Sequence, residues 1–547
     1  MLNKVWPNTF VNEANLTQQI FVLRRILGTD ESQQYIETIP RRGYRFASTI
    51  KELEEEHSEV KPESQPQVAA AAAAAQPSPV EAPTITSLAV LPLTNASDSP
   101  NTEYLTDGIT ESIISNLSQL ARLRVMARST VFRYRGAGAD PLGVGATLGV
   151  RLVLVGELRR GSDGVEVAAE LVDVRDGSQV WSGQYRRRLS SAYELQEEVA
   201  RAVAEKLFMN LTPGDNARLS RGETDDWEAY HLYLKGRYFL SRREFWKAMR
   251  YFEAAAALDK GYARAYAGLA DCHSELVQWD EIPPVIGYPA AKEVLLKAMA
   301  IDEALAETHT TMAIIKEFFD WEFETAEAEY RRSLSLNPNS ALTRRWYSTY
   351  LSRCGRWHEA LEELKLAQLT DPQPGLLSSK VGRLLYYARQ YERALEVGRE
   401  TIALAPNLAD AYIINSLVLV RLGRADEAVE AAVRGRELMG NSVEGLANLG
   451  HVYGAVGRRA QAFEVLAELN ELSQHRYVPH HMSAVVYAGL GEADETLVRL
   501  ERAFEERSYY MPALGTLPLF DVVRDDPRFK RLLQRIGLAP QLGGRGS

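Results

Sequence analysis

A spacing of 34 residues runs through the second half of this 547-residue chain and restricts its fold more than any other feature. Small residues recur at that interval, and in three units a proline follows twelve residues later. The small residues are Ala326, Ala360, Ala394, Ala428, Ala462 and Thr496, and the prolines are Pro338, Pro372 and Pro406. This period predicts a stack of helix pairs, because one pair cannot bury its apolar face alone. Small residues let neighbouring helices approach closely, and proline cannot continue a helix and sets the turn.

The motif inside the period resembles the tetratricopeptide repeat (TPR). It reads GRWHEAL at 355–361 and GRADEAV at 423–429. Ala291 and Ala248 extend the series backwards less regularly, with an insertion of about nine residues near 279–289. We expect about eight repeats over 229–512, within a segment 225–512, and a C-terminal capping helix and tail at 513–547.

Such a solenoid curves around an extended concave surface. The positions predicted to face it are Arg345, Arg383, Tyr386 and His451. Basic and aromatic groups there suit an acidic peptide or a protein C-terminus. The alternative is that these four are ordinary surface residues.

The first 46 residues predict a helix and then a basic hairpin. Residues 15–28 read NLTQQIFVLRRILG, with Leu16, Ile20, Leu23 and Leu27 on one face at the helical period. Residues 35–46 read YIETIPRRGYRF, two short strands around a tip with two arginines. Amide and guanidinium groups on such a helix can read base edges, and a basic hairpin tip can hold phosphate.

Together these two pieces resemble the recognition helix and wing of the OmpR/PhoB-type winged-helix domain. The resemblance implies double-stranded DNA as a partner, contacted by Thr17, Gln18, Arg24, Arg25, Arg41, Arg42 and Arg45. The sequence departs from this pattern in two ways, the first at Phe21 and Val22, which are apolar where many members are polar or basic. The small sheet and most of the two helices that open that domain are also missing before residue 2, so residues 1–50 are expected to form a partial winged helix. Whether Met1 is the true start then decides whether the arginines are functional.

Residues 51–84 predict a linker, acidic at first and then rich in Pro, Gln and Ala. Residues 85–213 predict a small α/β domain, with a buried strand at 87–93, a helix near 103–119, strands at 165–174 and 179–185, and a closing helix at 192–208. The stretches SLAVLPLTN, EYLTDGITESIISNLSQL, LGVRLVLVGELRR and ELVDVRDGSQVWSGQY resemble the TolB amino-terminal-like domain. That resemblance implies binding of a partner or ligand and no catalysis.

One glycine-rich stretch invites a different interpretation. Residues 143–149 read GVGATLG, which looks like a phosphate-binding loop. A dinucleotide loop follows a strand and opens a helix, whereas this stretch is predicted to end a helix and lead into a strand. Close packing of a helix on the sheet is therefore the favoured explanation.

Composition limits the remaining possibilities. The net charge is −10, so DNA affinity would have to be local, and residues 1–50 carry six Lys/Arg against four Asp/Glu. The two cysteines, Cys272 and Cys354, predict neither a disulfide scaffold nor a metal site, and suggest a reducing cytoplasm. No apolar run reaches the length of about 20 residues that a membrane helix needs. We find no catalytic motif, cofactor motif or metal-ligand spacing, and expect no enzyme activity.

The expected architecture is mainly α: a partial winged helix, a small α/β domain and an α-solenoid of TPR helix pairs. The expected function is a cytoplasmic DNA-binding transcriptional regulator with a protein-interaction module, for which a homo-oligomer is one option. Two alternatives stay open. One is a scaffold that binds partners only through its repeats, and the other is an accessory acting in trans on a signalling enzyme such as a cyclase or kinase.

Overall fold

A computed structural model of the chain describes residues 36–39, 43–46, 86–97, 102–136, 140–161, 164–188, 191, 194–208, 211–219, 224–373 and 375–538. It divides into two compact units, residues 1–80 and residues 81–547. In the first unit, β1 (Ile36–Ile39) and β2 (Gly43–Phe46) form an antiparallel hairpin with Glu37 opposite Arg45. The predicted hairpin is therefore present, and the predicted recognition helix at 15–28 lies outside the described residues.

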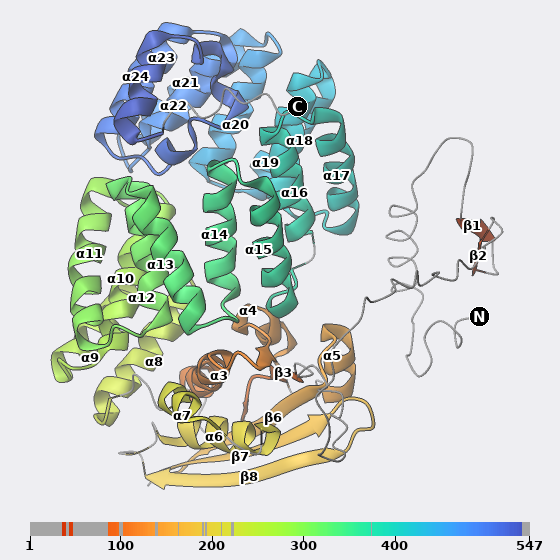
Figure 1. The fold of residues 1–547 in the computed structure, drawn as a ribbon. Coiled ribbons are helices and arrows are strands. Elements are labelled where there is room, and N and C mark those ends of the chain that lie inside the picture. The colour runs from red at the N-terminus through yellow and green to blue at the C-terminus, as the bar shows by residue number, and fades with distance from the viewer. Residues whose placement is uncertain are drawn as a thin grey trace, which may run out of the picture. The chain divides into compact units, whose positions relative to one another are not determined.

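The second unit begins with a mixed sheet in the order β5-β3-β6-β7-β8, with β4 beside β6 (Figure 1). The first three of these strands run parallel and the last two antiparallel. The strands are β3 (Thr86–Val90), β4 (Thr94–Asn95), β5 (Leu123–Val125), β6 (Leu152–Arg160), β7 (Gly164–Asp173) and β8 (Gln179–Arg188). The helices of this part are α3 (Glu103–Ser118), α4 (Arg128–Val131), α5 (Pro141–Leu148), α6 (Glu194–Phe208) and α7 (Pro213–Leu219), with a short 3-10 turn η2 (Phe132–Tyr134) after α4.

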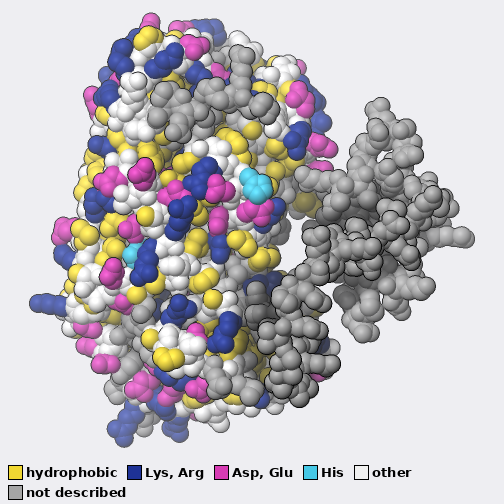
Figure 2. All heavy atoms as spheres, viewed as in Figure 1, with side chains coloured by type: hydrophobic (Ala, Val, Ile, Leu, Met, Phe, Trp, Pro, Cys, Tyr) yellow, Lys and Arg dark blue, Asp and Glu magenta, His cyan; other side chains and the backbone are white. Residues whose placement is uncertain are grey.

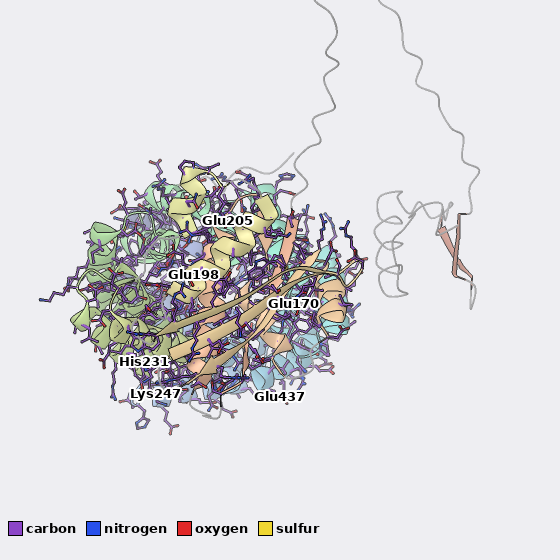
Figure 3. The ribbon with its side chains drawn as sticks, turned by 90° about the horizontal axis from the view of Figure 1, so that it is seen from below. Glu170, Glu198, Glu205, His231, Lys247 and Glu437 are labelled. Carbon is purple, nitrogen blue, oxygen red and sulfur yellow. The ribbon has the colours of Figure 1, made fainter. Side chains whose placement is uncertain are left out.

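The alternation of apolar and polar residues along the strands decides which face of the sheet is covered by helices. On β7, Val165, Val167 and Leu171 are fully buried, while Glu170 belongs to the opposite face and pairs with Ser182 of β8. The helix α6 packs on β7 and β8, and Figure 3 shows its Glu198 and Glu205 from below, with Glu170 labelled on the sheet. The period of two in the sequence thus places one apolar face under helices.

The glycine-rich stretch at 143–149 lies in α5 and leads into β6, as expected. Asp140 caps the start of α5 by accepting from the backbone N–H of Leu142 and Gly143, and Gly149 ends it at φ 61°. A Cβ on Gly145 would come within 2.3 Å of a Val174 methyl group. The glycine therefore serves close packing of the helix on the sheet.

Eight helix pairs follow, which confirms the predicted α-solenoid. The first helices of the pairs are α8 (Trp227–Ser241), α10 (Ala263–Gln278), α12 (Ala306–Ile315), α14 (Ala341–Arg353), α16 (Leu376–Tyr387), α18 (Ala409–Arg421), α20 (Val443–Ala455) and α22 (His480–Leu490). The second helices are α9 (Phe245–Leu258), α11 (Pro284–Ile301), α13 (Phe323–Leu336), α15 (Trp357–Thr370), α17 (Tyr391–Leu404), α19 (Ala425–Leu438), α21 (Arg459–Leu472) and α23 (Ala493–Glu505).

The periodic small residues are where neighbouring helices meet. Every member of the series lies on a second helix with no exposed surface: Ala326, Ala360, Ala394, Ala428, Ala462 and Thr496. The helices α20 and α22 also approach closely, at Gly489. A Cβ there would lie 2.3 Å from the carbonyl oxygen of His451, so only glycine fits. Side-chain size at these positions therefore sets the spacing of the stack.

The stack ends in a cap and closes back on an earlier repeat. Beyond α23, the turns η5 (Met511–Ala513) and η6 (Pro518–Val523) lead to α24 (Pro527–Ile536), the expected capping helix. Arg507 donates from Nη1 to the carbonyl oxygen of Phe319 at 2.9 Å, and its guanidinium lies 3.8 Å from the ring centre of Trp321. Phe319 belongs to a π-helical turn, η4 (Lys316–Asp320), that ends α12. The eighth repeat therefore contacts the third.

Candidate partner-binding surface of the repeats

The seven residues predicted to bind DNA cannot be placed from the described side chains. Thr17, Gln18, Arg24, Arg25, Arg41 and Arg42 lie outside the described residues, and only the backbone of Arg45 is described, in β2. On the face of the molecule in Figure 2, basic and acidic side chains are interspersed, in keeping with the overall charge of −10.

The four predicted groove residues lie on the first helices of their repeats, and each already has a structural partner. Arg345 donates from Nη1 to Asp371 at 2.5 Å, and Arg383 pairs with Asp410. Tyr386 is 1% exposed and packs against the rings of Tyr387 and Tyr391. His451 is buried, and its Nδ1–H donates to the carbonyl oxygen of Val485 at 2.9 Å. Burial lowers the pKa of His451 to about 4, so the ring is neutral at pH 7.

Those four residues therefore do not form an open row of free side chains. Tyr386 and His451 are buried between helices of the stack and are not exposed on its concave surface. The helical period assigns a residue to one face of a first helix. It does not show whether that face is open on the concave surface or packs against the next repeat.

The α/β part occupies the concave side of the first four repeats. A cavity of about 520 Å³ is lined by α3 and by the first helices α8, α10, α12 and α14, with Ser112 and Ser115 on the α3 side. Across it, Glu111 of α3 pairs with Arg237 of α8. Burial raises the pKa of Asp271 in the same wall to about 7, even though Thr311 donates to it at 2.6 Å. A partner of these repeats would have to share this space with α3.

Two turns that carry periodic prolines hold the α/β part in place. In the turn at Pro338, Asn339 donates from Nδ2 to the carbonyl oxygens of Ser118 and Leu123, each at 2.8 Å. In the turn at Pro372, the carbonyl oxygen of Thr370 accepts from the backbone N–H of Ala127 at 2.7 Å. These contacts are polar, whereas α3, α6 and the first two repeats share one continuous apolar core.

A second region brings together charged groups from distant repeats, and it was not predicted from the sequence. We call this region the interior cluster: Lys380 and Arg383 of α16, Glu444 of α20, Asp280 after α10, and Tyr509 and Tyr510 after α23. Glu444 acts electrostatically on the other five. Closure of the stack creates this cluster, since Asp280 belongs to the second repeat and Glu444 to the seventh.

A signal for Lys380 was nevertheless present in the period. The equivalent positions, spaced by 34 residues, are Met312, Trp346, Ile414, Asn448 and Met482. Four of these five are buried, at Met312, Ile414, Asn448 and Met482. A lysine at a position that is otherwise buried and mostly apolar marks a group placed inside the structure for a reason other than packing.

Within the ranges given above, no group of three or more His, Cys, Asp or Glu side chains is arranged to hold a metal ion. Of the helices placed there, none combines the length and apolar character needed to cross a bilayer.

Comparison with known proteins gives two relatives of different kinds. The chain is 33% identical over 263 residues to putative adenylate cyclase 3 of Rhizobium meliloti, covering 47% of this chain and 44% of that protein. It is 23% identical over 464 residues to the transcriptional regulator HilA of Salmonella typhimurium, covering 83% of this chain and 76% of HilA. The chain thus spans less than half the length of the cyclase relative. No protein-family model matches the chain.

Among solved structures, PilF of Pseudomonas aeruginosa aligns with 40% of this chain at 20% identity and a TM-score of 0.30. The TPR protein YrrB, described as having an unusual peptide-binding site, aligns with 35% at 21% identity and a TM-score of 0.22. These alignments cover the helical repeats only in part, and the assignment of the repeats rests on the helix pairs themselves.

Proposed function

We propose that this chain is a DNA-binding transcriptional regulator whose helical repeats take a protein partner. The observation that carries the proposal is the extent of the similarity to HilA, which runs through 83% of the chain and is not confined to the repeats. The β1–β2 hairpin and the basic sequence around it support the same proposal. The eight stacked repeats form a protein-interaction module, as such solenoids do.

In this proposal Thr17, Gln18, Arg24, Arg25, Arg41, Arg42 and Arg45 contact DNA. The arginines neutralise phosphate and the helix reads base edges. With a net charge of only +2 on residues 1–50, one copy would bind weakly, and a dimer would strengthen binding.

The test is capture of genomic DNA fragments by the full chain, followed by gel-shift titration of the enriched fragments. We expect Arg24→Ala, Arg25→Ala and Arg42→Ala together to weaken binding at least tenfold and to reduce its salt dependence. A matched triple variant at exposed arginines of the repeats, Arg399→Ala, Arg434→Ala and Arg502→Ala, controls for loss of charge. Equal binding by the two triple variants and the parent chain would refute DNA binding through this segment.

A second candidate function is an adaptor that acts in trans on a signalling enzyme. The observation in its favour is the 33% identity to putative adenylate cyclase 3 over 263 residues. We propose no catalytic role for this chain itself. Absence of DNA capture together with a change in cyclase activity when the chain is added to a cell extract would favour the adaptor.

A further inference from the structure

The interior cluster contains charged groups that the protein leaves without partners. Within the described part of the chain, Lys380 makes no hydrogen bond or ion pair, and neither does Glu444. The Oδ1 atom of Asp280 and the Nε atom of Arg383 are buried without a hydrogen-bond partner there. Buried polar groups are almost always satisfied, and exceptions call for a ligand or ordered solvent.

The pKa values of Lys380 and Asp280 show that burial in the cluster disfavours their charged forms. Burial, with the nearby Arg383, lowers the pKa of Lys380 to about 8. Burial, with the neighbouring Glu444, raises the pKa of Asp280 to about 8, although Arg476 opposes this. Both groups are therefore held in surroundings that disfavour their charged forms, and each would gain from an oppositely charged group.

Both signs of charge are present in the interior cluster, and they act on one another without forming an ion pair. Lys380 and Arg383 lie on α16, whereas Glu444 comes from α20 and Asp280 from the end of α10. No ion pair joins Lys380 or Arg383 to Glu444 or Asp280 in the described structure, although Arg383 pairs with Asp410. A ligand of a single sign would satisfy one side only.

Aromatic rings complete the surroundings. The two aromatic members of the cluster, Tyr509 and Tyr510, have their ring centres 6.0 Å apart, and Tyr510 interacts electrostatically with Arg383 and Tyr387. Tyrosine faces attract a cation that has been removed from water. Aromatic rings beside charged groups that lack partners are typical of a binding site more than of a packed core.

We propose that the interior cluster binds a zwitterionic ligand, with its carboxylate toward Lys380 and Arg383 and its ammonium or guanidinium group toward Glu444 and Asp280. Such chemistry is available from a free amino acid or dipeptide, and from a polypeptide segment that carries acidic and basic side chains. If the ligand is a polypeptide segment, the inference rests on the proposed protein partner and specifies that the partner presents a segment of mixed charge. It does not depend on DNA binding.

The experiment is calorimetric titration of the full chain with four probes. Two carry both charges: the dipeptide Arg-Asp, and an eight-residue peptide of alternating Lys and Glu with blocked ends. Two carry charges of a single sign: N-acetylglutamate, with two carboxylates, and agmatine, with an ammonium and a guanidinium group. We expect at least one mixed-charge probe to bind about tenfold or more tightly than either single-sign probe, because a probe of one sign lacks one of the two kinds of charged contact; tenfold corresponds to about 1.4 kcal/mol.

The decisive variant is Lys380→Met, because Met312 and Met482 occupy the equivalent positions and methionine is compatible with the stack. We expect Lys380→Met and Glu444→Gln each to weaken the mixed-charge probe at least tenfold, with unfolding midpoints within a few degrees of the parent. Lys365→Met, at an exposed lysine paired with Glu362 on α15, is the matched control and should leave binding unchanged.

Binding of the dipeptide as tightly as the peptide would identify a free metabolite as the source, and binding of the peptide alone would identify a polypeptide segment. Absence of binding by both mixed-charge probes overturns the inference, as does equal binding by Lys380→Met and the parent. A gel shift with Lys380→Met separates this outcome from the proposed DNA binding, which the substitution should not affect.

Discussion

The carboxylate of Asp371 joins the α/β part to the repeats at a point that solvent does not reach. Its side chain is 0% exposed and accepts from Thr130 Oγ1 at 2.6 Å and from Arg345 Nη1 at 2.5 Å. Gln373 donates a third hydrogen bond at 2.9 Å. Removing this carboxylate therefore leaves donors from both parts of the molecule without an acceptor.

We predict that Asp371→Ala lowers the free energy of unfolding by about 3 kcal/mol. Breaking a buried ion pair from one side costs about 3–5 kcal/mol. The lower end applies because Arg345 is 25% exposed and water recovers part of its hydration, whereas Thr130, with no exposed surface, cannot recover its acceptor. An unsatisfied buried hydroxyl alone costs about 1–3 kcal/mol.

The assay is urea unfolding followed by tryptophan fluorescence, with hydrogen exchange at the Ala127 amide as a local report. Ala127 donates to Thr370, next to the substituted residue, so its exchange should accelerate. Asp426→Ala serves as the control, since Asp426 pairs with Arg458 but is 96% exposed, and should cost no more than about 0.5 kcal/mol. The reasoning is refuted if the two variants lose the same stability.

The pH dependence gives a second check on the same carboxylate. Burial raises the pKa of Asp371, but the hydrogen bond from Thr130 and the charge of Arg345 outweigh it and hold the pKa below its usual range. A depressed carboxyl pKa adds stability above the unfolded-state value near 3.9, and that stability is lost as pH falls through the folded pKa. The difference between the parent and Asp371→Ala should therefore shrink below about pH 4.

Three further predictions concern packing, titration and closure. Gly489→Ala should destabilise the chain by about 1–3 kcal/mol, because the new Cβ would lie 2.3 Å from the carbonyl oxygen of His451 and force α20 and α22 apart; thermal unfolding measures this. Asp173→Asn should lose stability at pH 7 and match the parent near pH 2, because a hydrogen bond from Arg175 lowers the pKa of Asp173 to about 2. Arg507→Ala should increase proteolytic cleavage near η4 without unfolding the repeats, since it removes the contact with Phe319 and Trp321.

Each of these has its own control. Gly382→Ala is matched to Gly489→Ala, because a Cβ at Gly382 would meet no atom closer than 3.9 Å, and it should be neutral or slightly stabilising. Asp176→Asn, at an exposed position in the turn that follows Asp173, controls for loss of one charge near the same strand. Arg502→Ala, on the exposed side of α23, controls for Arg507→Ala. Equal effects of a variant and its control would contradict the corresponding prediction.

The fold of the repeats could be predicted because a period is a local property repeated many times. The small residues at 34-residue spacing predicted the second helices of six pairs and the turns at Pro338 and Pro372, and Ala291 and Ala248 extended the count to eight. The strands and helices of the α/β part also followed from alternation and capping, as Asp140 and Gly149 show at the ends of α5. The partial winged helix stays a prediction beyond the β1–β2 hairpin.

The binding residues were harder to predict, because the period gives the face of a helix and says nothing of what covers it. Arg345 and Arg383 were placed on the correct helices, but only the structure shows that carboxylates already hold them. It also shows that α3 covers the first four repeats.

The sequence by itself determined which helices form and in what order, since the apolar and small positions that drive stacking lie within one repeat of each other. Only the tertiary structure decided where the chain closes and which charges that closure brings together. Asp280, Lys380 and Glu444 lie in the second, fifth and seventh repeats, and no local pattern links them. Their proximity depends on the curvature summed over all eight pairs, a small rotation per repeat that the packing of each interface sets.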